Sequence, residues 1–421
     1  MMNKSAILLL SSIGITSIGS WIYFIALNLM IFNETGSAAA VGLLYIIRPA
    51  AALLTTFWCG SLVDRVQKKR LMFWLTLLQS LLVTGVGILS DTLWISYLFV
   101  FLLQMCSSIL QPAGMSFTAL LIPGDKLHRF NAIRSLLDSG AFLVGPAIAG
   151  LLLMNGSAVT AIFINSVALL VSAMFILVIS FKERPDASDM QSKSFSIKTD
   201  LMSDWKSTLQ FRQTDRQMWG VYFLFTLFIV LQTAVDSLEV AFAKDALLLT
   251  DTQYGLLVSC AGAGMIIGAA INVAGAAKWS TSVLIGTGSL MTAAGYLIFA
   301  ASTDFFVACA GVSLLGAALA FANTGFLTRI QKRVPVEYMG RISSFFHFVE
   351  ALLVITVTAA FAWSASQFPI RLTVLSGVFV MVLITGYLSF MLFKGKELLK
   401  RHDQMTKHFK IINIFTTKST K

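Results

Sequence analysis

Two carboxylic acids stand three residues apart inside a long apolar stretch of this sequence. Asp236 and Glu239 follow an apolar run that begins near residue 218, and the basic residue Lys244 comes shortly after them. A charged side chain in hydrocarbon is costly, so such groups face a cavity or a partner. Burial also raises the affinity of a carboxylate for a proton. We expect Asp236, the deeper of the two, to couple to protons, and Glu239 to form a solvated ion pair with Lys244.

Four further ionisable residues lie within apolar stretches, and each is a candidate for ion coupling. Arg48 lies near the middle of one stretch, and Asp138 lies early in another. Glu350 lies near the middle of a third, with His347 one helical turn away on the same face. His347 could relay protons, although a lone histidine in an apolar helix is more often a hydrogen-bonded packing residue.

A cluster of charges interrupts the apolar character of the chain between residues 60 and 70. The sequence there reads Gly-Ser-Leu-Val-Asp-Arg-Val-Gln-Lys-Lys-Arg. So many charges cannot lie in hydrocarbon, which predicts a short loop between two membrane helices. Its excess of Lys and Arg predicts that the loop is cytoplasmic.

The composition shows why these charged residues stand out. The chain has 421 residues, of which 57% are hydrophobic and 12% charged, whereas a soluble domain has about 25% charged residues. This indicates an all-α polytopic membrane protein, and its first span is too long for a cleavable signal peptide. The four cysteines show no paired spacing, and the histidines are few and scattered. We therefore expect no disulfide, no metal site and no cofactor.

Twelve apolar segments are long enough to cross a bilayer, which takes about 20 helical residues. We predict spans near 6–32, 38–60, 71–90, 93–118, 131–154, 157–181, 218–243, 254–277, 280–301, 304–327, 342–365 and 370–393. An even number puts both termini on one side. Nearly all basic residues share that side, which predicts cytoplasmic termini. The net charge of +11 is then an orientation signal toward the lipid bilayer and not a nucleic-acid contact.

The chain also consists of two similar halves. The motif Val-Gly-Leu-Leu at residues 41–44 recurs as Tyr-Gly-Leu-Leu at 254–257, and Pro123 and Arg129 recur as Pro335 and Arg341, about 212 residues later. We predict four parts: an N-terminal six-helix bundle over 1–181, a cytoplasmic linker over 182–217, a C-terminal six-helix bundle over 218–393, and a basic tail over 394–421. Apolar residues four apart in the linker predict an amphipathic helix on the inner leaflet.

The charged loop resembles the signature G-x-x-x-D-R-x-G-R-[RK]-[RK] of the major facilitator superfamily. The matching residues are Gly60, Asp64, Arg65, Lys69 and Arg70, while Gln67 and Lys68 depart from the pattern. The resemblance implies that Asp64 caps or pairs with the cytoplasmic end of the eleventh helix, where Arg341 lies. It further implies that this loop, with Arg65 and Arg70 engaging neighbouring helix ends, latches a gate and does not bind substrate.

The fifth span resembles the fifth-helix signature of drug–proton antiporters in that superfamily. Gly145, Pro146 and Gly150 match, and Ala149 replaces a glycine. A proline kinks a helix and small residues allow close approach, which suits a helix at a moving interface. Ordinary tight packing is the alternative. The arginine of the antiporters' fourth-helix signature has no counterpart here, which argues against a proton relay built on it.

The superfamily resemblance implies two pseudo-symmetric six-helix bundles in which the second and eleventh helices are neighbours. We therefore predict an ion pair between Arg48 and Glu350 whose breakage is a step in alternating access; the alternative is a permanent pair for Glu350. The resemblance also implies a central cavity lined by the first, fourth, seventh and tenth helices. Polar and aromatic candidates for its lining are Trp21, Asn28, Gln104, Gln111, Gln232 and Asn323.

Within the superfamily the chain is similar to bacterial exporters of the macrolide-efflux type. This implies a monomeric secondary transporter of the bacterial inner membrane that exports a bulky amphipathic compound in exchange for protons. Other cargoes, such as a siderophore or a lysophospholipid, are alternatives, as is a non-transporting scaffold or sensor. An enzyme is not expected, because the sequence shows no nucleophile–base or metal constellation.

Overall fold

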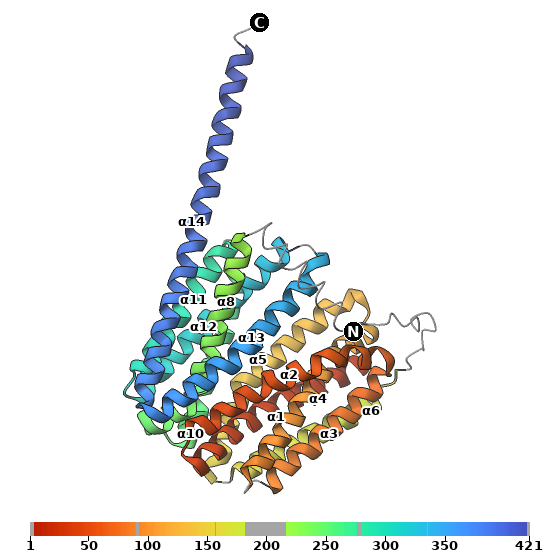
Figure 1. The fold of residues 1–421 in the computed structure, drawn as a ribbon. Coiled ribbons are helices and arrows are strands. Elements are labelled where there is room, and N and C mark those ends of the chain that lie inside the picture. Colours follow the sequence, from red (N-terminus) through yellow and green to blue (C-terminus); the bar gives the residue numbers. More distant parts are fainter. Residues whose placement is uncertain are drawn as a thin grey trace.

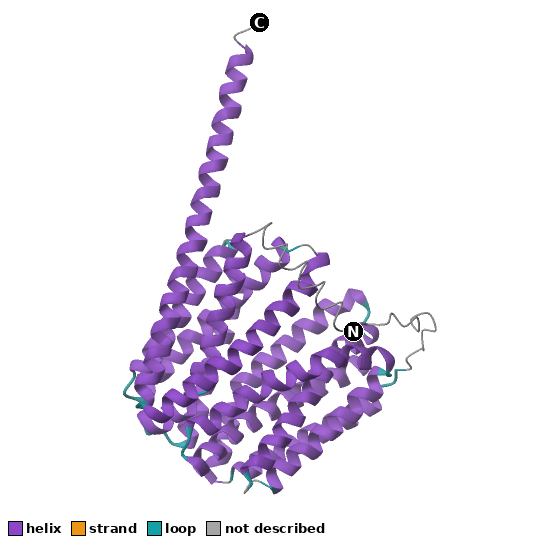
Figure 2. Ribbon diagram, in the orientation of Figure 1, coloured by secondary structure: helices purple, strands orange, loops and turns teal. Residues whose placement is uncertain are grey.

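The computed structural model describes residues 4–89, 92–155, 157–181, 216–275, 279–334 and 336–418. Within these ranges the chain forms thirteen α-helices, one short π-helix and no strand (Figure 2). Twelve of the α-helices are long and apolar enough to cross a membrane. The predicted fold class and number of spans are therefore confirmed.

The helices form two bundles of six spans each (Figure 1). The first bundle comprises α1 (Lys4–Thr35), α2 (Ala38–Arg65), α3 (Lys68–Ile88), α4 (Leu93–Leu121), α5 (Gly124–Asn155) and α6 (Ala158–Val178). The second comprises α8 (Arg216–Asp236), α10 (Asp251–Gly275), α11 (Thr281–Ala301), α12 (Phe305–Arg333), α13 (Val336–Gln367) and α14 (Ile370–Lys418). Between α8 and α10 lie a single turn, α9 (Glu239–Ala241), and the π-helix η1 (Phe242–Ala246).

Both chain termini lie toward the same end of the molecule, which we call the terminal end; the opposite end is the distal end (Figure 1). Several helices begin at the distal end with an N-cap side chain. Ser37 accepts a hydrogen bond from the Ala40 amide at the start of α2, and Asp304 accepts from two amides at the start of α12. Such caps satisfy backbone donors that have no partner within the helix, and so fix where each span starts.

Three boundaries differ from the prediction. The helix α2 continues to Arg65 and α3 begins at Lys68, so the charged loop has only two residues between helices. Arg and Lys are good helix formers, and outside hydrocarbon they extend the spans. The seventh span breaks after Asp236, and the last helix runs on through most of the predicted basic tail to Lys418. Residues 182–215 of the predicted linker, including its amphipathic stretch, lie outside the described residues.

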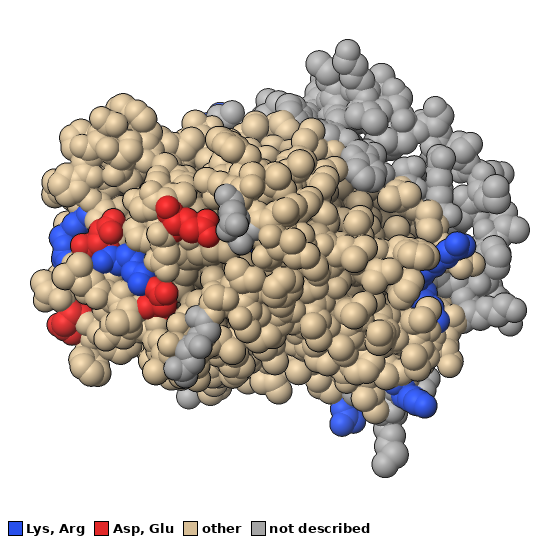
Figure 3. All heavy atoms as spheres, turned by 90° about the horizontal axis from the view of Figure 1, so that it is seen from below, with Lys and Arg blue, Asp and Glu red and all other residues tan. Residues whose placement is uncertain are grey.

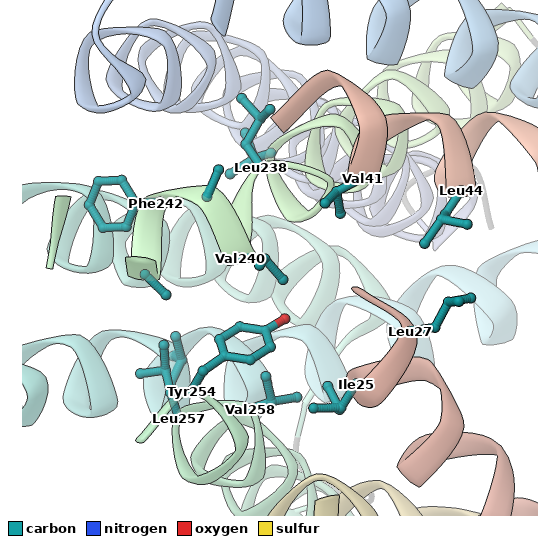
Figure 4. Packing of buried hydrophobic residues seen from close by; sticks show 14 of the residues in the cluster. Ile25, Leu27, Val41, Leu44, Leu238, Val240, Phe242, Tyr254, Leu257 and Val258 are labelled. Carbon is teal, nitrogen blue, oxygen red and sulfur yellow. The ribbon is translucent and has the colours of Figure 1, made fainter. Parts of the chain in front are cut away.

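The two bundles meet along α2 with α13 and α5 with α10. Near the distal end a single core cluster contains residues from both bundles. Figure 4 shows Ile25 and Val41 of the first bundle opposite Val240 and Tyr254 of the second. Near the terminal end two separate core clusters are found, one around Phe117 within the first bundle and one within the second. The described bundles are thus packed together at the distal end and packed separately at the terminal end.

Arg371, the second residue of α14, binds backbone carbonyl groups of two neighbouring segments at the distal end. Its guanidinium donates hydrogen bonds to the carbonyl oxygens of Ser302 (2.7 Å), Ala300 (3.4 Å) and Ala246 (3.3 Å), and lies 5.3 Å from the centre of the Phe242 ring. Carbonyls at helix C-termini lack partners within the helix and attract cations.

We expect Arg371→Ala to destabilise the folded protein by on the order of 2 kcal/mol, since hydrogen bonds to a charged group are lost and carbonyls are left unpaired. Thermal unfolding in detergent, followed by size-exclusion fluorescence, measures this as a lower midpoint temperature. Arg371→Lys keeps the charge but not the planar fork, and should give an intermediate midpoint. Equal midpoints for all three proteins would contradict this role.

Candidate functional site

The seventh span is interrupted at its two carboxylates. The helix α8 ends at Asp236, a turn follows at Ser237 and Leu238, and Glu239 opens α9, which passes directly into η1. A π-helical turn inside a helical segment is rare and often marks a functional site. The prediction of one continuous helix to residue 243 is therefore wrong, and the break separates the two acids.

Asp236 is surrounded by polar groups of the second bundle. The hydroxyl of Tyr296 on α11 donates a hydrogen bond of 2.5 Å to Asp236 Oδ1. Gln232, one turn earlier on α8, is another polar neighbour of this carboxyl group. The Gln232 Oε1 atom is buried and has no hydrogen-bond partner among the described residues. Glu239 is near enough to interact electrostatically with Asp236, so two ionised carboxylates here would repel each other in a low dielectric.

One residue of the first bundle reaches the same place. Tyr45 on α2 lies in the electrostatic field of Asp236, Glu239 and Arg48. Tyr254 on α10 also neighbours both carboxylates, and its hydroxyl points toward Val240 in Figure 4. We call Tyr45, Asp236, Glu239, Tyr254 and Tyr296 the carboxylate site. It spans the boundary between the bundles, near the distal end.

The predicted ion pair between Lys244 and Glu239 is absent from the structure, which describes both residues. Its ammonium group forms an ion pair with Asp251, the first residue of α10. Asp251 also accepts a hydrogen bond of 3.2 Å from Asn33 Nδ2 on α1. Lys244 lies in η1, whose wider turn changes the side of the segment that it occupies. Seen from the distal end, Asp, Glu, Lys and Arg side chains lie together on one side of the surface, and further Lys and Arg side chains lie at other edges (Figure 3).

Helices α5 and α10 approach so closely that their glycines are required. A Cβ atom on Gly255 would lie 2.5 Å from the Pro146 carbonyl oxygen, and one on Gly150 would lie 2.9 Å from the Thr252 carbonyl oxygen. The Thr252 hydroxyl donates back to the Gly150 carbonyl at 3.0 Å. We call these contacts, with the Asn33–Asp251 hydrogen bond, the distal seam. Pro146 and Gly150 thus face the other bundle, whereas Gly145 packs against Trp21 of its own bundle.

An open cavity of about 500 Å³ lies between α1, α5 and α10. Its polar lining includes Thr16, Ser17 and Ser20 of α1 and Asp138 of α5. The Ser17 hydroxyl donates a hydrogen bond of 2.7 Å to Asp138 Oδ1, and Arg134 Nε lies 3.8 Å from Oδ2. The cavity therefore presents a carboxylate, with hydroxyl groups beside it, near the middle of two spans.

Aromatic side chains form the apolar part of this cavity. Trp21 and Phe142 lie with their ring centres 4.4 Å apart, and Met265 contributes from the second bundle. Trp21 and Asp138 were predicted separately, one for substrate and one for ions, and the structure brings them together. The hydroxyl residues were not predicted, because Ser and Thr are common in apolar helices and carry no signal of their own.

The other predicted cavity residues lie elsewhere. Asn28 is fully buried in the distal core, where its Nδ2 donates to the Phe24 carbonyl at 2.8 Å. Gln104 is partly buried, and Gln111 and Asn323 are exposed. None of these four residues lines the described cavity.

Arg48 and Glu350 are on helices that pack together, as predicted, since α2 contacts α13. In this conformation Glu350 lies 3.5 Å from His347 Nδ1, and Arg48 is exposed. The ion pairs of the described residues include none between Arg48 and Glu350. Their pairing stays a prediction.

The charged loop is described only in part. Lys69 Nζ donates to the Ile179 carbonyl oxygen at the end of α6 (2.6 Å), and Arg70 is exposed. The structure does not describe the side chains of Asp64, Arg65 and Arg341. The contacts of Gly60 also lie outside what it describes. The predicted gate latch therefore stays a prediction. Among the described residues no group of three or more His, Cys, Asp or Glu could hold a metal ion.

Comparisons with known proteins agree with this architecture. Residues 9–358 match the family described as the Major Facilitator Superfamily. The uncharacterized MFS-type transporter YfiS of Bacillus subtilis (strain 168) is 27% identical, with 80% of this chain and 81% of YfiS covered. Macrolide efflux protein A of Streptococcus pyogenes is 19% identical, with 79% and 82% covered. The crystal structure of a mutant of the nucleoside transporter NupG superposes with a TM-score of 0.72 at 12% identity, covering 93% of this chain and 99% of NupG.

Proposed function

The chain belongs to the Major Facilitator Superfamily, and on that premise we propose that it is a secondary active exporter that exchanges an amphipathic drug-like compound for protons. The observation that carries the proposal is the carboxylate site at the boundary of the bundles. Asp236, Glu239 and Tyr296 come from the second bundle, and Tyr45 comes from the first. A titratable group at such a boundary can make the contact between bundles depend on its proton.

We place the terminal end in the cytoplasm. The excess of Lys and Arg in the loops of that end supports this orientation. The bundles share a core at the distal end and have separate cores at the terminal end. On this orientation the structure corresponds to an inward-facing carrier, closed toward the outside by the distal seam.

The coupling step follows from the chemistry of Asp236. When the carrier opens outward, the carboxylate site meets water and Asp236 takes up a proton. When the distal end closes, the neutral acid is tolerated beside Glu239, whereas two ionised acids would repel. Tyr296 donates to Asp236 Oδ1 and holds the carboxyl group in place. Release of the proton inward then restores the repulsion and favours reopening, with cargo moving the opposite way.

The proposed cargo follows from the cavity and from the relatives. The cavity combines a carboxylate and hydroxyl groups with the aromatic rings of Trp21 and Phe142. Such a lining suits a bulky compound that has an apolar body and a few polar groups. The name of macrolide efflux protein A supports macrolide-like compounds, while siderophores and lysophospholipids are the alternatives to be tested next. We place the protein in a bacterial inner membrane, acting as a monomer.

Accumulation of a radiolabelled macrolide in energised bacterial cells tests this proposal. We expect cells that express the wild-type protein to accumulate less macrolide than cells with an empty vector, and an uncoupler to abolish the difference. Asp64→Asn should also abolish it, because the predicted latch loses its charge. Equal accumulation with and without the protein would reject macrolide cargo. A difference that survives collapse of the proton gradient would reject proton coupling.

A further inference from the structure

Asp138 is the only charged residue that lines the described cavity. Its side chain is 50% exposed, although it lies well inside the span Arg129–Met154. A carboxylate at this depth is costly unless something compensates it. The Ser17 hydroxyl occupies Oδ1 at 2.7 Å, so the contact left for a cation is at Oδ2.

The present partner of Asp138 Oδ2 is a poor one. Arg134 approaches only through Nε, at 3.8 Å, from one turn earlier on the same helix. A well-formed Arg–carboxylate pair has two parallel hydrogen bonds at shorter distance. An exposed pair between residues four apart contributes little free energy. A cation that enters the cavity and contacts Oδ2 directly can therefore replace Arg134.

The aromatic rings beside Asp138 suit the same kind of ligand. The faces of Trp and Phe rings attract cations. Trp21 and Phe142 lie together in the lining, and Trp21 also contacts Phe24 edge-on with ring centres 5.7 Å apart. Met265 completes the cavity from α10, so a ligand held here contacts both bundles.

We propose that Asp138 binds a cationic group of the substrate, and that Arg134 serves as the substitute cation that pairs with Asp138 while the cavity is empty. This inference rests on the proposed function, because it assigns a substrate class to its cavity. The substitute cation has a purpose in an exporter. The empty carrier must change conformation without substrate, and an unpaired carboxylate in the span would hinder that step.

Equilibrium binding to the purified protein in lipid nanodiscs tests the assignment without any gradient. Three probes of similar aromatic character differ in charge: tetraphenylphosphonium is a cation, triphenylphosphine oxide is neutral and tetraphenylborate is an anion. We expect Asp138→Asn to weaken tetraphenylphosphonium binding roughly tenfold, the scale of one charge–charge attraction in a partly exposed cavity, with little change for triphenylphosphine oxide. Asp138→Glu should restore part of the affinity. Asp304→Asn, which replaces an exposed helix cap, is the matched control and should change nothing.

Arg134→Gln should change tetraphenylphosphonium binding in the opposite direction. Removing the competing cation should tighten tetraphenylphosphonium binding severalfold and yet slow net export in cells, because the empty carrier is left with an unpaired acid. Weaker binding in Arg134→Gln, or equal losses for all three probes in Asp138→Asn, would overturn the assignment. So would a wild-type protein that exports macrolide but binds no cation. Charge-selective binding without any export would instead reject the proposed function and leave the subsite standing.

Discussion

Replacing Gly255 with valine should reduce transport at least tenfold while the protein still inserts and folds. The Cβ of any other residue at this position would lie 2.5 Å from the Pro146 carbonyl oxygen and 2.8 Å from Gly150 Cα. These are backbone atoms, which cannot move aside as a flexible side chain would. Overpacking of this kind costs about 1–3 kcal/mol in cores that can relax. The distal seam cannot relax without parting, so the closed seam becomes the minor state and transport should fall at least tenfold.

The population shift can be measured directly. In a Leu249→Cys background, where the side chain is buried in the core cluster shared by both bundles, a membrane-impermeant maleimide should label the distal end faster when Gly255→Val is added. Gly386→Val is the matched control, because a Cβ at Gly386 meets no atom within 4 Å. It should leave transport and labelling unchanged. Full transport by Gly255→Val would show that the closed seam is not part of the cycle.

Asp236→Asn should abolish transport driven by a proton gradient and preserve exchange of substrate for substrate. Asparagine has the shape of aspartic acid and can still accept the hydrogen bond from Tyr296, but it does not titrate. The carrier is therefore fixed in the neutral form at this position. Proteoliposomes with an imposed pH gradient should accumulate substrate only to the level of empty vesicles, while counterflow continues at a rate similar to that of the wild type.

Two comparisons make the Asp236 result specific. Asp304→Asn removes a carboxylate that caps α12 and lies outside the carboxylate site, and it should keep full coupling. Glu239→Gln tests the second acid of the site. If Asp236→Asn remains coupled and Glu239→Gln does not, the proton is carried by Glu239 and our assignment within the pair is wrong.

The number of spans and the pairing of α2 with α13 could be predicted because each depends on a simple quantity. The length of an apolar run sets the span, and the superfamily resemblance set the helix order. The break between Asp236 and Glu239 could not be predicted. No glycine or proline marks it, and its surroundings are compatible with a helix. Contacts with distant residues, such as Tyr296 on α11, accompany the interruption.

The sequence predicted those residues of the candidate site that carry a charge. Asp138 and Asp236 stood out because ionised groups are rare in apolar spans. Ser17 and Tyr45 could not be recognised in the sequence, since hydroxyl and aromatic residues occur on all faces of such helices. The spans are apolar all round, so periodicity could not tell which residues face the cavity. Asn28 was misplaced for this reason: it is fully buried in the distal core.

The seam between α5 and α10 is made largely of glycine and backbone atoms, whereas the cavity beside it is made of side chains. The residues of the cavity can therefore vary, whereas the glycines of the seam cannot. On the proposed function, a substitution at Ser17 or Phe142 would change the compounds that the cavity accepts and would leave the closing surface at Gly150 and Gly255 untouched. Single substitutions in the cavity can therefore alter the exported compound during evolution while the contact surface between α5 and α10 stays the same. A protein engineer who wants a different export specificity has the same freedom.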